Sequence, residues 1–366
     1  MKSFGNKVLY IVISQLRVGG AERVASILLR LLDQTGKYKL VVESDFEGGV
    51  FYQLPDNIIK VQRKINNLRK NPFGKFMHLM KMINTRRDFI KQYGADVVIS
   101  FMPFEFFVSK IATLGMHKKH IASDHTSMGR DMGHFINFLR HHFYNKADYV
   151  TILTQKDARI VEKQLSNIVV VPNPLTYKPL PHDVFTSREK IILCVGRVNQ
   201  WEIKGFDRII HIWASIAQKY SDWKLCIAGE VSTETEKYLK SLAPNLSERQ
   251  LLFLGQCSDM ETLYRRASIF ALPSRVEGFP MVLVEAMSQG CACVAYSLDG
   301  AIDEIIDDKK DGLIIPDNDI EGFKQAMESL IENQSESRSL STRAKVNIMR
   351  FNCDAFLKKW LAMIEN

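Results

Sequence analysis

Several patterns that would assign a function directly are missing from this sequence. No apolar run reaches the roughly 18–20 residues that span a bilayer, and the six cysteines include no Cys-x-x-Cys pair. Their irregular spacing argues against a zinc site or a disulfide framework and suits a reducing cytoplasm. The motifs of serine hydrolases, zinc metalloproteases and protein kinases are also absent, as are the Gly-x-Gly-x-x-Gly dinucleotide fingerprint and the P-loop.

The composition is that of an ordinary globular protein. With 366 residues, 46% apolar and 25% charged, the chain is long enough for two domains with substantial cores. Its net charge of +8 is divided unevenly, because residues 1–173 carry 26 Lys/Arg against 14 Asp/Glu while the remainder carries 23 against 27. A basic first half predicts a polyanionic partner for that half alone.

Apolar runs alternate with glycine-containing loops and helical patterns in both halves of the sequence. The runs are continuously apolar, as expected for buried parallel strands. They cover residues 7–13, 39–44, 97–101, 120–123, 149–153 and 168–171, and then 191–195, 224–228, 251–254, 269–272, 292–295 and 313–315. The predicted fold class is therefore α/β, with two Rossmann-like domains facing a cleft in which a ligand binds.

A proline-rich segment at 172–181 separates the two halves and is the best candidate for a linker. We therefore expect a first domain over residues 1–172 and a second over residues 173–348. The last segment, 349–366, has an amphipathic pattern over residues 351–364, which predicts one helix with an apolar stripe to bury.

The strongest candidate site follows the apolar run at 269–272. Glu277 and Gly278 lie in the loop, and Pro280 suits the first turn of a helix that continues to residue 288. The N–H groups at such a helix start form an anion site. Glu285 stands in an apolar helical segment, where a charge needs a partner. The two carboxylates suit an elongated polar ligand; alternatively, Glu277 is a surface cap and Glu285 a solvated helix residue.

Two other loops carry candidate phosphate contacts. Arg197 and Lys204 flank the loop after residues 191–195, where an arginine binds a diphosphate in bidentate fashion and a lysine adds a point charge. Gly19 and Gly20 follow the first predicted strand and allow the backbone to approach a ligand closely at a helix start. Alternatively, the two cations are surface charges and the glycines form a plain turn.

Histidines and one acidic motif add weaker signals. His125 follows the run at 120–123 and so faces the expected cleft, although a lone loop histidine is more often structural. His134, His141 and His142 stand among aromatic residues and predict a basic aromatic helix face rather than a metal site. Residues 317–319 match the Asp-x-Asp pattern that binds a metal and a diphosphate in another sugar-transfer fold, but the preceding proline favours a helix start.

A basic stretch from Lys60 to Lys91 contains ten Lys/Arg and one acid, with phenylalanine and methionine residues interleaved. This pattern fits a segment that lies on an anionic membrane surface, where each cation contributes about 1 kcal/mol. The alternative is a solvated face above a buried stripe. Nucleic acid is not an expected partner, because no recognition module accompanies the charge.

Taken in order, these motifs resemble the retaining glycosyltransferases of family 4, which have the two-domain GT-B fold. The resemblance spans most of the chain and rests on Gly19-Gly20-Ala21-Glu22-Arg23, Val170–Pro174, Gly196-Arg197 with Lys204-Gly205, and the Glu-x7-Glu motif from Glu277 to Glu285. It implies that the first domain binds the acceptor and the second the nucleotide-sugar. It also implies that the C-terminal helix packs back on the N-terminal domain.

The resemblance implies a role for each candidate residue. Arg197 and Lys204 would hold the donor diphosphate, and Glu277 would bind sugar hydroxyls near the reacting carbon. Glu285 would bind the ribose, and His125 would touch the donor sugar. The remaining donor contacts would come from the backbone of Gly19, Gly20, Gly278, Phe279, Pro280 and Met281.

The implied reaction transfers a hexose or N-acetylhexosamine from a UDP-sugar, with retention, to a glycan or undecaprenyl-linked acceptor in cell-surface polysaccharide synthesis. No metal or other cofactor is expected, because two cations and a helix dipole stabilise the departing diphosphate. The loop at 299–304 departs from the Gly-Gly-x-Pro-Glu of many members. Together with the Asp-His-Thr loop at 124–126, its Asp-Gly-Ala looks most like members with galactose-type or N-acetylhexosamine donors. The enzyme is expected on the cytoplasmic face of the cell membrane, as a peripheral protein.

Two alternative functions fit the same fold. A non-hydrolysing UDP-sugar 2-epimerase would need no acceptor, but it usually carries more acid–base carboxylates and histidines than this sequence offers. A membrane-docking scaffold with a vestigial nucleotide site is the non-enzymatic alternative. The presence of Arg197, Lys204, Glu277 and Glu285 together argues against such decay.

Overall fold

The computed structural model describes residues 7–63, 71–181, 188–298 and 300–366. The chain forms two compact units: unit 1 contains residues 1–174 and 353–366, and unit 2 contains residues 175–352. The backbone therefore passes between the units twice, after Pro174 and after Asn352. The expected domain boundaries, after residues 172 and 348, lie a few residues earlier in the chain.

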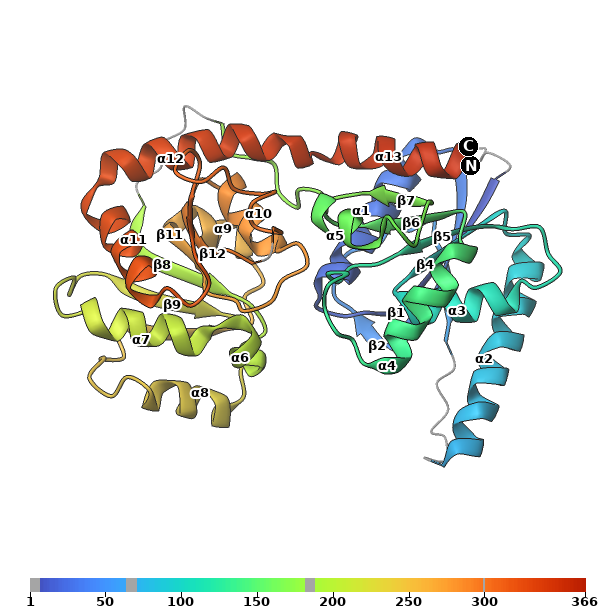
Figure 1. The fold of residues 1–366 in the computed structure, drawn as a ribbon, viewed down its shortest axis with the longest axis horizontal. Coiled ribbons are helices and arrows are strands. Elements are labelled where there is room, and N and C mark those ends of the chain that lie inside the picture. The colour runs from blue at the N-terminus through green and yellow to red at the C-terminus, as the bar shows by residue number, and fades with distance from the viewer. Residues whose placement is uncertain (1–6, 64–70, 182–187, 299) are drawn as a thin grey trace. The chain divides into compact units, whose positions relative to one another are not determined.

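Unit 1 is built on a parallel sheet whose described strands run in the order β3-β2-β1-β4-β5-β6-β7 (Figure 1). The strands are β1 (Lys7–Leu16), β2 (Tyr38–Val50), β3 (Ile59–Gln62), β4 (Val97–Phe101), β5 (Lys119–Ser123), β6 (Tyr149–Ile152) and β7 (Ile168–Val170). The helices are α1 (Gly20–Thr35), α2 (Pro72–Tyr93), α3 (Pro103–Ala112), α4 (His134–Phe143), α5 (Gln155–Val161) and α13 (Cys353–Glu365).

Unit 2 repeats this design with the order β10-β9-β8-β11-β12-β13, again all parallel. Its strands are β8 (Glu189–Val195), β9 (Lys224–Ala228), β10 (Leu251–Gly255), β11 (Ala267–Leu272), β12 (Ala292–Tyr296) and β13 (Leu313–Ile315). Its helices are α6 (Trp201–Lys204), α7 (Phe206–Ile216), α8 (Thr233–Ser241), α9 (Met260–Arg266), α10 (Met281–Ser288), α11 (Ile320–Glu332) and α12 (Gln334–Asn347).

The apolar runs explain why these segments form strands. β4 and β12 are buried at every position. Both faces of a parallel sheet are covered by helices, so its strands carry apolar residues on both faces. The α/β prediction and twelve expected strands are confirmed, with small differences at their ends. β3 was not expected, because its sequence Ile-Lys-Val-Gln alternates and it lies at the sheet edge, where one face can remain polar.

Helix α13 belongs to unit 1 (Figure 1), which confirms the prediction that the C-terminal helix packs on the N-terminal domain. Its Trp360 is buried, and Lys7 Nζ donates to the carbonyl of Ile364 at 2.7 Å. The amphipathic pattern predicted a helix from Phe351, but the helix begins at Cys353. The reason is that Phe351 ends a short 3-10 turn (Ile348–Phe351) and Asn352 then adopts an extended backbone, while the Phe351 ring packs edge-on against Phe279 in unit 2 with centroids 5.2 Å apart.

A buried cluster of two carboxylates and two guanidinium groups holds β2, α2 and α3 together. Arg86 donates to Glu43 at 2.6 and 2.9 Å and to Glu105 at 2.8 Å, and Arg63 donates to both oxygens of Glu105 at 2.7 Å. Burial by itself raises the pKa of Glu43, but Arg86 and Arg63 hold that pKa below its ordinary value. Two cations of the basic stretch are therefore structural rather than available to a membrane.

The rest of the basic stretch is divided between helix α2 and residues 64–70, which lie outside the described residues. Arg87 is also engaged, because it donates to the carbonyls of Ala112 and Leu114 at 2.9 Å. Among the described residues, none of the helices combines the length and the apolar character that crossing a membrane requires.

We expect Arg86→Met to lower the free energy of unfolding by about 3 kcal/mol or more, because it leaves the buried carboxylates of Glu43 and Glu105 short of a partner. Urea denaturation of the full chain measures this loss. Lys91→Met is the matched control, since Lys91 is exposed on the same helix and should cost less than about 0.5 kcal/mol. Equal losses in the two variants would contradict a structural role for the cluster.

Candidate functional site

The strand order reverses once in each sheet, and the candidate residues gather at those two places. In unit 1 the reversal lies between β1 and β4, and in unit 2 it lies between β8 and β11. Loops that leave the carboxyl ends of neighbouring strands diverge at such a switch point and leave room for a ligand. Gly19 follows β1, whereas Gly196 and Ser274 follow β8 and β11.

In unit 2 the switch point brings Lys204 and Glu277 together. Lys204 Nζ lies 2.7 Å from Glu277 Oε1, and Ser274 Oγ donates to the same oxygen at 2.8 Å. All three side chains are largely buried. Lysine and glutamate residues that are distant in sequence thus form one charged pair, with a serine that fixes the carboxylate.

A glycine makes this approach possible. Gly205 has a φ of 68°, a backbone conformation that favours glycine, and a Cβ at this position would lie 1.9 Å from the carbonyl oxygen of Pro273. Any side chain here would push the loop after β8 away from the loop after β11. The two loops are also joined by the Arg275 N–H, which donates to the carbonyl of Ile203 at 2.8 Å.

A second ion pair between the same loops was missed by the sequence analysis. The Arg275 guanidinium binds Asp207 in bidentate fashion, with distances of 2.8 and 2.6 Å. This pairing lowers the pKa of Asp207, although burial acts in the opposite direction. Arg197, in contrast, is exposed and forms no ion pair with another described residue. It is therefore a cation at the switch point that is available to a ligand.

The helix start that the sequence predicts lies beside the Lys204–Glu277 pair. Helix α10 begins at Met281, with Pro280 as its N-cap residue and no side chain capping it. Gly278 precedes it in the same loop, and Phe279 is buried against Phe351. The amide N–H groups of the first turn of this helix carry the positive end of its dipole.

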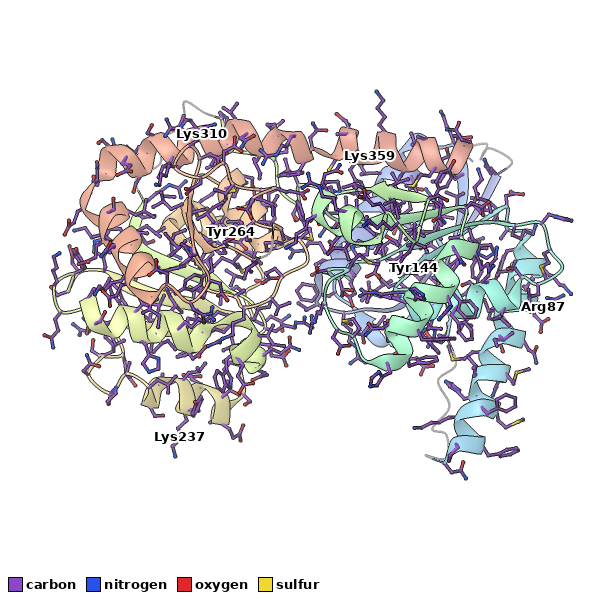
Figure 2. The ribbon with its side chains drawn as sticks, viewed as in Figure 1. Arg87, Tyr144, Lys237, Tyr264, Lys310 and Lys359 are labelled. Atoms are coloured by element: carbon purple, nitrogen blue, oxygen red, sulfur yellow. The ribbon has the colours of Figure 1, made fainter. Side chains whose placement is uncertain are left out.

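Glu285 lies inside α10 and is 2% exposed, so the expectation that its charge needs a partner is met. Thr176 Oγ1 donates to one carboxylate oxygen at 2.8 Å, and the Tyr264 hydroxyl donates to the other at 3.0 Å. Figure 2 shows Tyr264 in the interior of unit 2. The alternative of a solvated helix residue is wrong for Glu285, because both of its oxygens are bound by hydroxyl groups.

In unit 1 the glycine pair forms the entrance to helix α1. Gly19 is the N-cap residue, Gly20 is the first residue of the helix, and no side chain caps them. The Tyr52 hydroxyl lies 3.3 Å from the Gly19 nitrogen and 3.2 Å from its carbonyl oxygen. The Arg23 guanidinium stands over the Tyr52 ring at 5.1 Å.

His125 follows β5 in unit 1 and is partly buried. Its Nε2 lies 3.0 Å from Ser123 Oγ, and its ring stacks on Phe101 with centroids 5.2 Å apart. Burial lowers the pKa of His125 to about 4, while Asp124 and the side chain of Asn173 act in the opposite direction. The imidazole is therefore neutral at neutral pH.

The residue before this histidine anchors a buried network that the sequence analysis did not single out. Asp124 accepts hydrogen bonds from Arg140 at 2.8 and 3.0 Å, from Tyr144 at 2.8 Å and from Thr126 Oγ1 at 2.7 Å. Arg140 comes from α4, the helix that the aromatic and histidine pattern predicted. Asp124 could have indicated this network from the sequence, since an aspartate directly after a buried strand requires a hydrogen-bonding or charged partner.

The remaining candidates take structural roles. Asp319 caps α11 by accepting from the Gly322 N–H at 2.8 Å, and Asp317 pairs with Arg208 at 2.8 Å, so the predicted helix start at 317–319 is confirmed. Among the described residues, no group of three or more His, Cys, Asp or Glu side chains is arranged to hold a metal ion. In the loop at 299–304, Asp299 lies outside the described residues, and Ala301 and Ile302 are buried.

Both units match models of known protein families. Residues 18–176 match the model described as Glycosyltransferase Family 4, and residues 182–347 match the model described as Glycosyl transferases group 1. Two Rossmann-like units with these matches define a glycosyltransferase of the GT-B fold. The chain belongs to glycosyltransferase family 4.

Relatives and solved structures extend over nearly the whole chain. The amylovoran biosynthesis glycosyltransferase AmsD of Erwinia amylovora is 27% identical, over 97% of this chain and 98% of that protein. A Campylobacter jejuni alpha-1,4-N-acetyl-D-galactosaminyltransferase, named for a diNAcBac-PP-undecaprenol acceptor, is 24% identical over 96% and 97%. A mutant of S. aureus TarM, solved with fondaparinux, alpha-GlcNAc-glycerol and UDP, shares the fold with a TM-score of 0.80 at 13% identity, covering 98% of this chain and 100% of that one.

The neutral His125 predicts that the protein loses stability in mild acid. Because its pKa in the folded state lies below the ordinary value of 6.5, its contribution is complete above about pH 6.5 and is lost as the pH falls toward 4. From pH 7 to pH 5, the wild-type protein should lose about 2 kcal/mol more than His125→Gln. Urea midpoints at the two pH values measure the difference.

His142→Gln is the control for this experiment, because His142 is an exposed residue of α4. It should keep the pH dependence of the wild-type protein. The same dependence in His125→Gln as in the wild type would show that His125 is not held neutral.

Proposed function

We propose that this family 4 enzyme transfers a hexose or N-acetylhexosamine, with retention and without a metal, from a UDP-sugar to a glycan or undecaprenyl-linked acceptor. One observation carries the proposal. The Lys204–Glu277 pair and the start of α10, which no side chain caps, both lie at the switch point of unit 2. A cation, a fixed carboxylate and a row of amide donors match a diphosphate joined to a sugar.

The diphosphate would bind Arg197, Lys204 and the first turn of α10. Arg197 is exposed and can make a bidentate contact, whereas Lys204 can bridge from Glu277 to a phosphate oxygen without leaving its partner. These positive groups would stabilise the charge that develops on the departing diphosphate, which is the function that a metal serves elsewhere.

Glu277 would accept hydrogen bonds from sugar hydroxyls. Its orientation is set by Ser274 and Lys204 before any donor arrives, so little reorganisation is needed on binding. Glu285 would bind the ribose, whose hydroxyls would join or replace those of Thr176 and Tyr264. Uridine is the proposed base, and the S. aureus TarM structure that contains UDP supports this choice.

The transfer step would need no protein base. In a front-face reaction the acceptor hydroxyl attacks the anomeric carbon from the side on which the diphosphate leaves, and its proton passes to the departing phosphate oxygen. A neutral His125 would contact a hydroxyl of the donor sugar without adding charge. The backbone at Gly19 and Gly20 would approach the phosphate and the acceptor.

We further propose that helix α2 brings the enzyme to an anionic membrane surface on the cytoplasmic side, where a lipid-linked acceptor is available. Phe73 and Phe76 at the start of α2 are 72% and 57% exposed, and Lys75 and Lys81 lie on the same helix and are exposed. Apolar side chains beside cations favour the interface between headgroups and acyl chains. The undecaprenol in the name of the Campylobacter relative supports such an acceptor.

The donor proposal predicts that UDP and one UDP-sugar raise the melting temperature of the protein in EDTA, whereas GDP and ADP do not. Arg197→Ala and Glu285→Gln should each weaken UDP binding by about 10- to 100-fold, the value of one charge-assisted hydrogen bond. Titration calorimetry measures both affinities. Glu285→Gln is used because a smaller residue would open a cavity beside Tyr264.

Lys237→Ala is the matched control, since Lys237 projects from α8 into solvent (Figure 2). It should bind UDP as the wild type does. Nucleotide binding that requires a divalent metal, or no nucleotide response at all, would contradict the proposed donor site.

The membrane proposal predicts that the protein sediments with vesicles that contain phosphatidylglycerol and not with vesicles of phosphatidylcholine alone. Lys75→Ala/Lys81→Ala should reduce this partitioning about tenfold or more, since each cation contributes about 1 kcal/mol. Phe73→Ser/Phe76→Ser should also reduce it. Phe51→Ser, a change at a 45% exposed residue outside α2, is the control. Sedimentation without a preference for anionic lipid would overturn the proposal.

A further inference from the structure

Three aromatic rings form a column in unit 1 that ends at His125. The His125 ring lies on Phe101 with centroids 5.2 Å apart and an interplanar angle of 11°. Phe101 in turn is stacked with Trp360, with centroids 6.5 Å apart and an angle of 17°. Phe101 is the last residue of β4, and Trp360 lies in the C-terminal helix α13. Phe101 and Trp360 are almost completely buried, so neither ring can move without repacking the core.

The edge of the His125 ring is fixed by hydrogen bonds. Thr151 Oγ1 donates to Ser123 Oγ at 2.8 Å, and Ser123 Oγ lies 3.0 Å from His125 Nε2. When the Ser123 hydroxyl donates a hydrogen bond to Nε2, the neutral imidazole carries its proton on Nδ1. The side chain of Asn173 also interacts with the ring. One face and the Nε2 edge of the ring are thereby defined by Phe101 and Ser123.

The backbone below the column is strained. Met102 directly follows Phe101 and has a φ of 77° and a ψ of 152°, a conformation that residues with a side chain rarely adopt. Its N–H donates to the carbonyl of Ser123 at 2.8 Å, and Ser123 is the hydrogen-bonding partner of His125. Strain of this kind persists only where surrounding contacts enforce it, and it occurs most often at functional sites.

Two of the residues that act on His125, directly or through Phe101, lie in segments next to the passages between the units. Asn173 immediately precedes the first passage, after Pro174, and Trp360 lies in the helix that follows the second, after Asn352. The column therefore links His125 to the C-terminal helix, the segment that re-enters unit 1 after the second passage.

We propose that Trp360 is a positioning residue for His125, acting through Phe101, so that helix α13 sets the orientation in which His125 meets the donor sugar. This inference rests on the proposed function in one respect, the contact between His125 and the donor. The placement of the ring by Trp360 follows from the column itself and can be tested without any substrate.

The test compares Trp360→Ala, Trp360→Phe and Met363→Ala in the full-length protein. Met363 is 2% exposed on the same helix and is the control for a general loss of packing. The first readout is the pKa of the His125 imidazole, followed by NMR of histidine-labelled protein and assigned with His125→Gln. The second readout is the split between kcat and KM for the donor, once the donor is known.

Trp360→Ala should raise the pKa of His125 from about 4 by at least one unit toward its ordinary value, because Phe101 can then move into the space of the indole and leave the imidazole less buried. Trp360→Phe should restore most of the wild-type pKa, and Met363→Ala should leave it unchanged. In the donor assay, kcat should fall about tenfold or more in Trp360→Ala relative to Met363→Ala.

An unchanged His125 pKa in Trp360→Ala, or an equal change in Met363→Ala, would overturn the positioning role. A failure of the proposed contact between His125 and the donor has a different signature: His125→Gln would then bind and transfer the donor as the wild type does. The NMR result would still decide whether Trp360 positions the ring.

Discussion

Parallel strands impose the constraint on which the rest of this molecule depends. Each strand must be joined to the next by a crossover, so the carboxyl ends of all strands in a sheet lie along one edge. Right-handed crossovers then force the connections to opposite faces wherever the strand order reverses. This reversal occurs between β1 and β4 and again between β8 and β11. The candidate residues of both units occupy the loops at that edge because the topology leaves space for a ligand there.

Buried polar clusters hold the loops at this edge, and the candidate residues on them, in defined positions. Asp124, Arg140 and Tyr144 fix the loop that carries His125, while Ser274 and Lys204 fix Glu277. A buried charge without a partner is costly, so each cluster tolerates few alternative arrangements. The cluster around Arg86 serves the same purpose farther from the site, where it ties α2 and α3 to β2. Rigidity in these loops thus comes from polar contacts rather than from apolar packing alone.

The sequence predicted the sheets well because buried parallel strands leave a direct trace, a continuous apolar run. β4, β9 and β13 were located to the residue for this reason. The motifs at Arg197, Lys204, Glu277 and Glu285 were also visible, since the first three lie between a strand and the next long helix and Glu285 is a charge in an apolar helical segment. Their grouping as donor-binding residues remains a prediction.

What the sequence did not contain was the pairing between distant charges. The pairing of Lys204 with Glu277 depends on the close approach of two loops at Gly205, and the hydroxyl partners of Glu285 come from Thr176 and Tyr264. Arg86 was counted with the basic stretch from Lys60 to Lys91, and Arg140 was not singled out, because arginine is usually exposed. Their burial depends on carboxylates in other elements, and single-sequence patterns do not record which charges meet.

The ion pair between Lys204 and Glu277 also has a consequence for competition in the cell. A lone buried lysine would attract any small anion, and chloride and inorganic phosphate are abundant. Here an incoming anion must contend with a carboxylate already 2.7 Å from the ammonium group. A monovalent ion gains little from that exchange, whereas a ligand that also reaches Arg197 and the start of α10 gains several contacts at once. If this is the donor site, as we propose, the ion pair would keep vacant enzyme free for large, multiply charged ligands.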